Sequence, residues 1–200
     1  MIINNKPDNI NTYEFWENKY ANSWETNCGR NQTREFIKAL LFHLPYIVKD
    51  DICDKSICDT SSALGDGVDE IVKEFPNAKV YGVEFSDVAL NKANIYYPDY
   101  VFHKELNNKY YALISSNTLE HFDHPIEILK QYLDYAKRYM IVLVPVNEEV
   151  YKYDKLGEHR VCFREDSFPN CIGIFHKVFQ KIFRVKVWAG EQMLVVYEKI

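Results

Sequence analysis

Two acidic residues in this sequence each close a short apolar run, and both positions suit the binding of a nucleotide-like ligand. Asp59 ends the run SICD (56 to 59) and is followed by a turn of small residues, TSSALGDG. Small side chains let the backbone approach a ligand, and the helix that follows offers N–H groups to a carboxylate or phosphate. Glu84 ends the next run 25 residues later. A carboxylate there can accept hydrogen bonds from both hydroxyls of a ribose.

These residues can act together only if the surrounding elements bring them to one edge of a sheet. Short apolar runs and amphipathic segments alternate along the middle of the chain, which predicts a parallel sheet with right-handed crossovers. In such a sheet the ligand crevice lies at the carboxyl ends of the strands. The expected strands are 56–59, 78–84, 100–103, 110–115 and 139–146, and the expected helices are 68–75, 86–94 with Ser86 as N-cap, and 124–138.

The two ends of the chain differ from this middle part. Trp16, Tyr20 and Trp24 recur every four residues and predict a helix, and a second helix over 33–44 ends at Pro45. Near the carboxyl terminus, 177–188 and 192–199 are joined by a turn that predicts an antiparallel hairpin. We therefore expect an α/β fold, doubly wound, with a mostly parallel sheet ending in an antiparallel hairpin. One domain over 1–200 would comprise a helical cap (1–50) and a Rossmann-like core (51–200).

The composition limits the kinds of ligand and partner that we expect this protein to bind. The 200 residues carry a formal net charge of −5 and no basic stripe, so we expect no nucleic acid. The amino terminus is polar and no apolar stretch approaches the ~20 residues of a membrane helix, so we expect a cytoplasmic protein without a membrane partner. The spacings Cys53-x4-Cys58 and Cys162-x8-Cys171 do not match the close pairs of structural zinc sites, so no metal is expected. Nothing in the sequence indicates the oligomeric state.

Three segments resemble a known family. SICDTSSALGDGVDEI is similar to the first motif of the class I S-adenosylmethionine-dependent methyltransferases, YGVEFSDVALNKA to their second, and ALISSNTLEHFDHP to their fourth-strand motif. The resemblance runs from about Tyr13 to the end of the chain. It implies a seven-stranded sheet with a reversed terminal strand, and S-adenosylmethionine as cofactor.

The resemblance also implies a role for individual residues. The turn from Asp59 to Gly65 would line the methionine part of the cofactor, Glu84 would hold the ribose, and Phe85 would pack on the adenine. Glu105 would face the adenine amino group, and the stretch from Ser115 to Asn117 would present backbone groups to the amino end. Tyr20 would either close over the methionine carboxylate or pack within its helix. The turn residues are Asp59, Thr60, Ser61, Ser62, Ala63 and Gly65.

The first motif departs from the family pattern, acidic-x-Gly-x-Gly-x-Gly. Ser61 and Ala63 replace two of the three glycines. If position 61 needs a positive φ, serine costs about 1 kcal/mol or more there. Ala63 would place a methyl group against the ligand. We expect either weak cofactor binding or a shifted backbone.

A hydroxyl acceptor also needs a group to remove its proton. The candidates are His121, His124 and His159; the first two suit capping or packing, which leaves His159, in the long segment after the fifth strand, as the predicted catalytic residue. Glu158 is the alternative. Tyr151 and Tyr153 would stack on a sugar or ring, or pack internally.

The leading hypothesis is methyl transfer to a hydroxyl or amine of a small molecule or sugar. SSNT follows the fourth strand in place of the Asn/Asp-Pro-Pro-aromatic motif of DNA amino methylation. A second hypothesis is a catalytically impaired, methyltransferase-like binding protein. A third, a nicotinamide-dependent enzyme, is disfavoured because the turn is further from the glycine pattern of that class.

Overall fold

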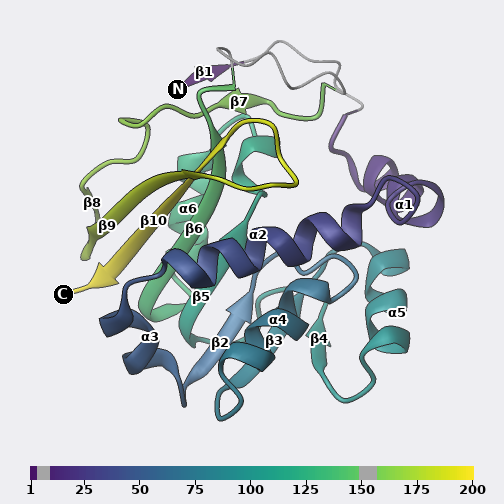
Figure 1. Ribbon diagram of the computed structural model, residues 1–200, viewed down its shortest axis with the longest axis horizontal. Helices are drawn as coiled ribbons and strands as arrows, with labels where there is room; N and C mark the ends of the chain where they lie inside the picture. Colours follow the sequence, from purple (N-terminus) through teal and green to yellow (C-terminus); the bar gives the residue numbers. More distant parts are fainter. Residues whose placement is uncertain (4–9, 149–156) are drawn as a thin grey trace.

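The computed structural model describes residues 1–3, 10–148 and 157–200, so Tyr151 and Tyr153 lie outside the described residues. Helices and strands alternate through the middle of the chain (Figure 1). The helices are α1 (Tyr13–Asn22), α2 (Gly29–His43), α3 (Tyr46–Ile52), α4 (Asp66–Glu74), α5 (Asp87–Tyr96), the 3₁₀ helix η1 (Leu119–His121) and α6 (Pro125–Leu133). The strands are β1 (Ile2–Ile3), β2 (Ser56–Asp59), β3 (Lys79–Val83), β4 (Val101–His103), β5 (Tyr110–Ser116), β6 (Ala136–Val146), β7 (Val161–Cys162), β8 (Cys171–Ile172), β9 (Phe175–Arg184) and β10 (Glu191–Lys199).

The main sheet has the strand order β4-β3-β2-β5-β6-β10-β9-β8. From β4 to β6 the strands pair in parallel, whereas β10 runs antiparallel to both β6 and β9. The winding reverses at β2, because the chain moves outward to β3 and β4 and then returns to β5 on the other side. The carboxyl ends of β3, β2, β5 and β6 therefore lie next to one another along one edge of the sheet.

The core lies on both faces of this sheet, as the apolar sequence of β6 predicts. Along β6, Met140, Val142 and Val144 face a cluster that includes α6. The alternate residues Ile141 and Leu143 face a second cluster built with α2, α3 and α4. Successive side chains of a strand point to opposite faces, so one continuous apolar run serves both layers.

Most expected elements are confirmed, and the expected seven-stranded sheet gains a two-residue eighth strand, β8, beyond β9. Ser86 caps α5 by accepting a hydrogen bond from the Ala89 amide at 3.1 Å. The prediction of a helix through residue 138 was too long, because α6 ends at Leu133 and β6 begins at Ala136. The Tyr110 amide donates to the Tyr135 carbonyl at 2.9 Å, so pairing with β5 overrides local helix propensity there.

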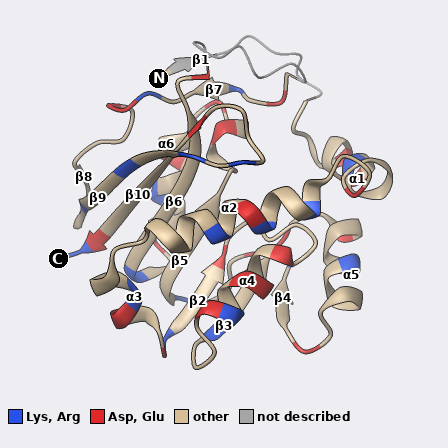
Figure 2. Cartoon of the chain, in the orientation of Figure 1, with Lys and Arg blue, Asp and Glu red and all other residues tan. Residues whose placement is uncertain are grey.

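A charged cluster fixes α2 against α4, the helix that starts at the predicted ligand turn (Figure 2). Asp66, in the first turn of α4, is 1% exposed. Its carboxylate accepts two hydrogen bonds from Arg30, at 3.0 Å from Nε and 3.0 Å from Nη2, and lies 2.8 Å from Arg34. Arg34 also pairs with Asp69 and Glu70 at 2.7 and 2.6 Å. Acidic side chains at a helix start also interact favourably with the helix dipole.

Candidate active site

A cavity of about 700 Å³ lies at the carboxyl ends of the central strands. Its walls include Asp59 after β2, Glu84 after β3, Asn117 after β5 and His159 after β6. Helix α1 contributes a further wall with Tyr20 and its neighbours. Cavities of this size in proteins typically hold small-molecule ligands and cofactors.

Glu84 is held in place at this cavity by two backbone amides. Its Oε2 accepts from Ala63 and its Oε1 from Ser86, each at 2.9 Å. The side chain is 2% exposed, and burial raises the pKa of Glu84 to about 7 despite these hydrogen bonds. Each carboxylate oxygen has a second lone pair, so the group retains capacity to accept two hydrogen bonds from ligand hydroxyls.

The turn from Asp59 to Gly65 is tied to both neighbouring strands. The Thr60 amide donates to the Ile114 carbonyl at 2.9 Å, and the Ser62 amide to the Val83 carbonyl at 2.8 Å. Burial raises the pKa of Asp59 to about 7. A Cβ on Gly67 would lie 2.7 Å from Asp59 Oδ2, so glycine lets α4 start directly against this carboxylate.

The condition for strain at Ser61 is not met, because the left-handed residues of the turn are Ala63, with φ 47°, and Gly65, with φ 87°. Ser61 has no positive φ, and its amide donates to Asp59 Oδ1 at 3.3 Å. Only Ala63 therefore carries the cost of about 1–2 kcal/mol for an L-residue in this conformation. The hydrogen bond from Ala63 to Glu84 depends on this backbone orientation, which joins the two parts of the predicted cofactor site.

Helix α1 covers the cavity with aromatic rings. Trp16 and Tyr20 on α1 pack together with Trp24, which follows the helix, with ring centroids 5.7 Å apart for Trp16 and Tyr20 and 5.1 Å apart for Tyr20 and Trp24. The Lys19 ammonium lies 4.7 Å from the Trp16 ring centroid and forms an ion pair with Glu158. Burial raises the pKa of Tyr20 well above its usual value. Tyr20 thus both packs within its helix and lines the cavity, so the two expected roles are compatible.

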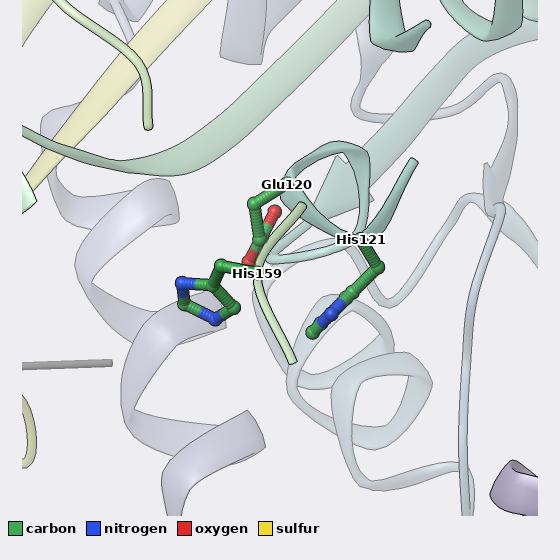
Figure 3. Close-up of side chains that lie close together, drawn as sticks. All are labelled: Glu120, His121 and His159. Carbon is green, nitrogen blue, oxygen red and sulfur yellow. The ribbon is translucent and has the colours of Figure 1, made fainter. Parts of the chain in front are cut away.

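A cluster of His and Glu side chains lies in the same cavity (Figure 3). Glu120 and His121, from η1, and His159 have potential ligand atoms within 4.8 Å of one another. The His159 Nδ1 lies 2.8 Å from a Glu148 carboxylate oxygen, and the His121 Nδ1 lies 3.1 Å from the Glu158 carbonyl oxygen. Ionised carboxylates and carbonyl oxygens only accept, so each Nδ1 carries a proton and donates it.

The fold of this chain, rather than its sequence, is similar to that of known proteins. A scan against protein-family models finds no match for the sequence, and neither does a search of curated proteins. Solved structures do match. The plantazolicin methyltransferase BpumL in complex with SAH superposes with a TM-score of 0.66 at 13% identity, over 92% of this chain and 94% of that one.

Two further solved structures have a similar fold. A candidate methyltransferase in complex with the Trm112 activator of Haloferax volcanii gives a TM-score of 0.69 at 11% identity, over 92% of this chain and 97% of that one. A candidate O-methyltransferase of Nostoc punctiforme gives 0.62 at 15% identity, over 92% of this chain and 60% of that one. The chain has the class I methyltransferase fold.

In this methyltransferase fold, the described residues from 157 onward are fastened to η1 at the cavity edge. The Arg160 amide donates to the Glu120 carbonyl at 2.7 Å, and the Arg160 guanidinium binds the Asp123 carboxylate at 2.8 and 2.9 Å. The Asn11 side-chain amide donates to the carbonyls of His121, at 3.0 Å, and of Glu158, at 2.6 Å. These bonds hold His121 and His159 together although 37 residues separate them.

Of the remaining predicted residues, Phe85, Glu105 and Asn117 line the cavity, whereas Ser62, Gly65 and Ser115 do not. Phe85 is 44% exposed and contacts Tyr13 edge to face, with ring centroids 6.2 Å apart. Asn117 has φ 49°, and its amide donates to the Leu143 carbonyl at 2.8 Å. Glu105 lines the cavity from after β4. His124 is exposed, so it belongs to neither the cavity nor the histidine cluster.

The sequence patterns missed Glu120 and Glu148 and assigned His121 to capping or packing. His121 suited packing, and it does pack against Trp16 with ring centroids 5.0 Å apart, but it also lies 5.1 Å from His159. Glu148 drew no attention, although a carboxylate directly after a buried strand is the same signal that identified Asp59 and Glu84. Among the described residues, no helix is both long and apolar enough to span a membrane.

Proposed function

We propose that this protein transfers a methyl group from S-adenosylmethionine to a hydroxyl or amine of a small molecule or sugar. One observation carries the proposal: a single cavity connects a buried carboxylate suited to a ribose, Glu84, with a histidine at its other side, His159. The methyltransferase fold supports the choice of cofactor, since the BpumL structures contain SAH.

The cofactor half of the site comprises the ends of β2, β3 and β5. Glu84 would accept hydrogen bonds from the ribose hydroxyls, Phe85 would lie against the adenine, and the turn from Asp59 to Gly65 would follow the amino-acid part. S-adenosylmethionine supplies an electrophilic methyl group on a positively charged sulfur. The lone pair of the acceptor forms the new bond to the methyl carbon while the C–S bond electrons return to sulfur.

The acceptor half lies toward His159 and is enclosed by Trp16, Trp24, Phe36 and Trp188. Aromatic side chains suit a ring or sugar, and an enclosed position favours a small acceptor. The protein chiefly orients the acceptor atom, and such positioning can contribute about 7–11 kcal/mol of a barrier. A hydroxyl acceptor also has to lose its proton, and His159 is the residue on which we expect that step to depend.

The choice of cofactor is tested by calorimetric titration. We expect S-adenosylmethionine and S-adenosylhomocysteine to bind with one site per chain, and NAD to give no heat at the same concentrations. NAD contains the same adenosine ribose but joins it to a pyrophosphate rather than to an amino-acid tail. Binding of NAD without binding of S-adenosylhomocysteine would overturn the proposal in favour of nicotinamide chemistry.

The alternative, an impaired methyltransferase-like protein, is tested at Ala63. We expect Ala63→Gly to change the affinity for S-adenosylhomocysteine less than threefold. The backbone strain of about 1–2 kcal/mol at Ala63 is already present in the folded protein without ligand, so its relief should change the free energy of unfolding rather than the affinity. A large gain in affinity would instead indicate that the site has decayed. Ser61→Gly is the matched control, because Ser61 has no positive φ to relieve.

A further inference from the structure

We propose that Glu120, His121 and His159 form a binding site for a divalent transition-metal ion at the acceptor side of the cavity. The three residues offer one carboxylate oxygen and two imidazole nitrogens within 4.8 Å of one another. Two histidines and one carboxylate are a common ligand set for zinc and related ions with one coordination position left open. This assignment departs from the sequence-based expectation that the protein has no metal.

The first support is an unpartnered buried oxygen. Glu120 is 1% exposed, and its Oε2 accepts no hydrogen bond from any of the described residues. A buried polar atom without a partner costs about 1–3 kcal/mol, more if charged, so its retention needs a reason. A cation between Glu120 and the two histidines provides the missing partner.

The second support is the orientation of the two rings. Glu148 accepts from His159 Nδ1, and the Glu158 carbonyl accepts from His121 Nδ1, so an acceptor orients each ring at that nitrogen. Histidines that bind metals typically donate their other ring N–H to a carboxylate or a backbone carbonyl in this way.

The third support is the local charge. The Glu148 carboxyl group lies next to the cluster at His159 Nδ1, whereas the nearby ammonium, that of Lys19, pairs with Glu158. Ligand atoms around one tetrahedral ion lie about 3.4 Å apart at bond lengths of about 2.1 Å. Small side-chain rotations therefore suffice to close the observed spacing.

The position of the site gives it a role in the proposed reaction, and this part rests on the proposed function. All three residues line the cavity, so the open coordination position faces the acceptor. A cation there would orient an acceptor oxygen and ease the loss of its proton to water. The substrate class is therefore an oxygen acceptor, a hydroxyl or enol, rather than an amine.

The test measures Zn²⁺ binding directly, without cofactor, on the full chain after removal of metals with a chelator. Cys171 Sγ lies 3.3 Å from His176 Nδ1 and offers a competing surface pair, so the parent protein carries Cys171→Ser. We expect calorimetry to show one Zn²⁺ per chain. Glu120→Gln and His121→Ala should each weaken binding about tenfold or more, and so should Glu148→Gln through the ring it orients. Co²⁺ should give a visible absorption band that the same variants lose.

His124→Ala is the matched control, since this exposed histidine lies three residues from His121, and its Zn²⁺ affinity should equal that of the parent. Mg²⁺ should bind far more weakly, because it prefers six oxygen ligands. Equal Zn²⁺ affinity in the parent and in all three variants would overturn the metal site. If the parent binds S-adenosylhomocysteine but no Zn²⁺, the metal site fails and the methyltransferase proposal stands. If the parent binds Zn²⁺ but no S-adenosylhomocysteine, the metal site stands and the methyltransferase proposal fails.

Discussion

Replacing Glu84 by glutamine is expected to weaken the binding of S-adenosylhomocysteine roughly 100-fold. A hydrogen bond to a charged group contributes about 1.5–3 kcal/mol, and the proposed ribose contact has two of them. The amide also turns an NH₂ group toward either the Ala63 or the Ser86 N–H, both of which now donate to the carboxylate. A donor then faces a donor, so the free energy of unfolding should fall by about 1–3 kcal/mol.

The pH dependence gives this experiment a second readout. Burial raises the pKa of Glu84 to about 7, and only the ionised form accepts at both oxygens. The affinity of the wild-type protein should therefore rise as the pH increases through 7, and Glu84→Gln should reduce that rise. Asp87→Asn, which removes an exposed carboxylate three residues away, should leave the affinity unchanged. A Glu84→Gln protein that is less stable but binds as tightly as the wild type would make the role of Glu84 purely structural.

Replacing His159 by alanine is expected to lower turnover about 100-fold and to leave the affinity for S-adenosylhomocysteine nearly unchanged. A positioned group that assists proton removal contributes about 10²–10⁴-fold to a rate. His159 follows β6, whereas Glu84 and Asp59 follow β3 and β2, so the change is remote from the proposed ribose and turn contacts. Turnover is measured as S-adenosylhomocysteine formed from acceptors found by screening small hydroxyl- and amine-bearing compounds.

The comparison of kcat with the cofactor dissociation constant separates this role from a general loss of structure. His124→Ala should retain wild-type turnover, because that histidine is exposed and outside the cavity. Glu148→Gln keeps the His159 ring but replaces the carboxylate that accepts from its Nδ1. It should reduce turnover less than His159→Ala does. Equal turnover of the His159→Ala and wild-type proteins would remove His159 from the reaction.

Much of the fold could be predicted because the signals are local. The apolar run SICD corresponds to β2 at both ends, and Ser86 caps α5 as its position before the helix suggests. The paired strands β9 and β10 follow from alternation around a turn. The overlong helix before β6 shows the limit, since residues 134 to 138 favour a helix until the hydrogen bonds of β5 decide their conformation.

The site could be predicted only in part, because its two halves differ in how they are built. Asp59 and Glu84 follow adjacent strands, so knowing the sheet is enough to place them together. The histidine cluster joins η1 to a segment 37 residues later through Asn11 and Arg160. No periodic pattern encodes such a contact. The backbone angles of the turn could not be predicted either. The glycine pattern suggested a positive φ at Ser61, whereas the non-glycine turn residue with a positive φ is Ala63.

The attachment of α1 has a consequence for how ligands exchange. Its Trp16 and Tyr20 pack in a small cluster with Ala63, Leu64 and Ala89, separate from the two clusters that flank the sheet. Its polar contacts include those with α5, where Glu17 accepts from Val88 and Lys92 donates to the Tyr20 carbonyl, and the ion pair of Lys19 with Glu158. Figure 1 shows α1 beside α5 at one end of the molecule. Releasing α1 breaks this cluster and leaves both sheet faces packed. Helix α1, which covers the cavity, can therefore detach in a sub-global opening that costs less free energy than unfolding of the whole protein.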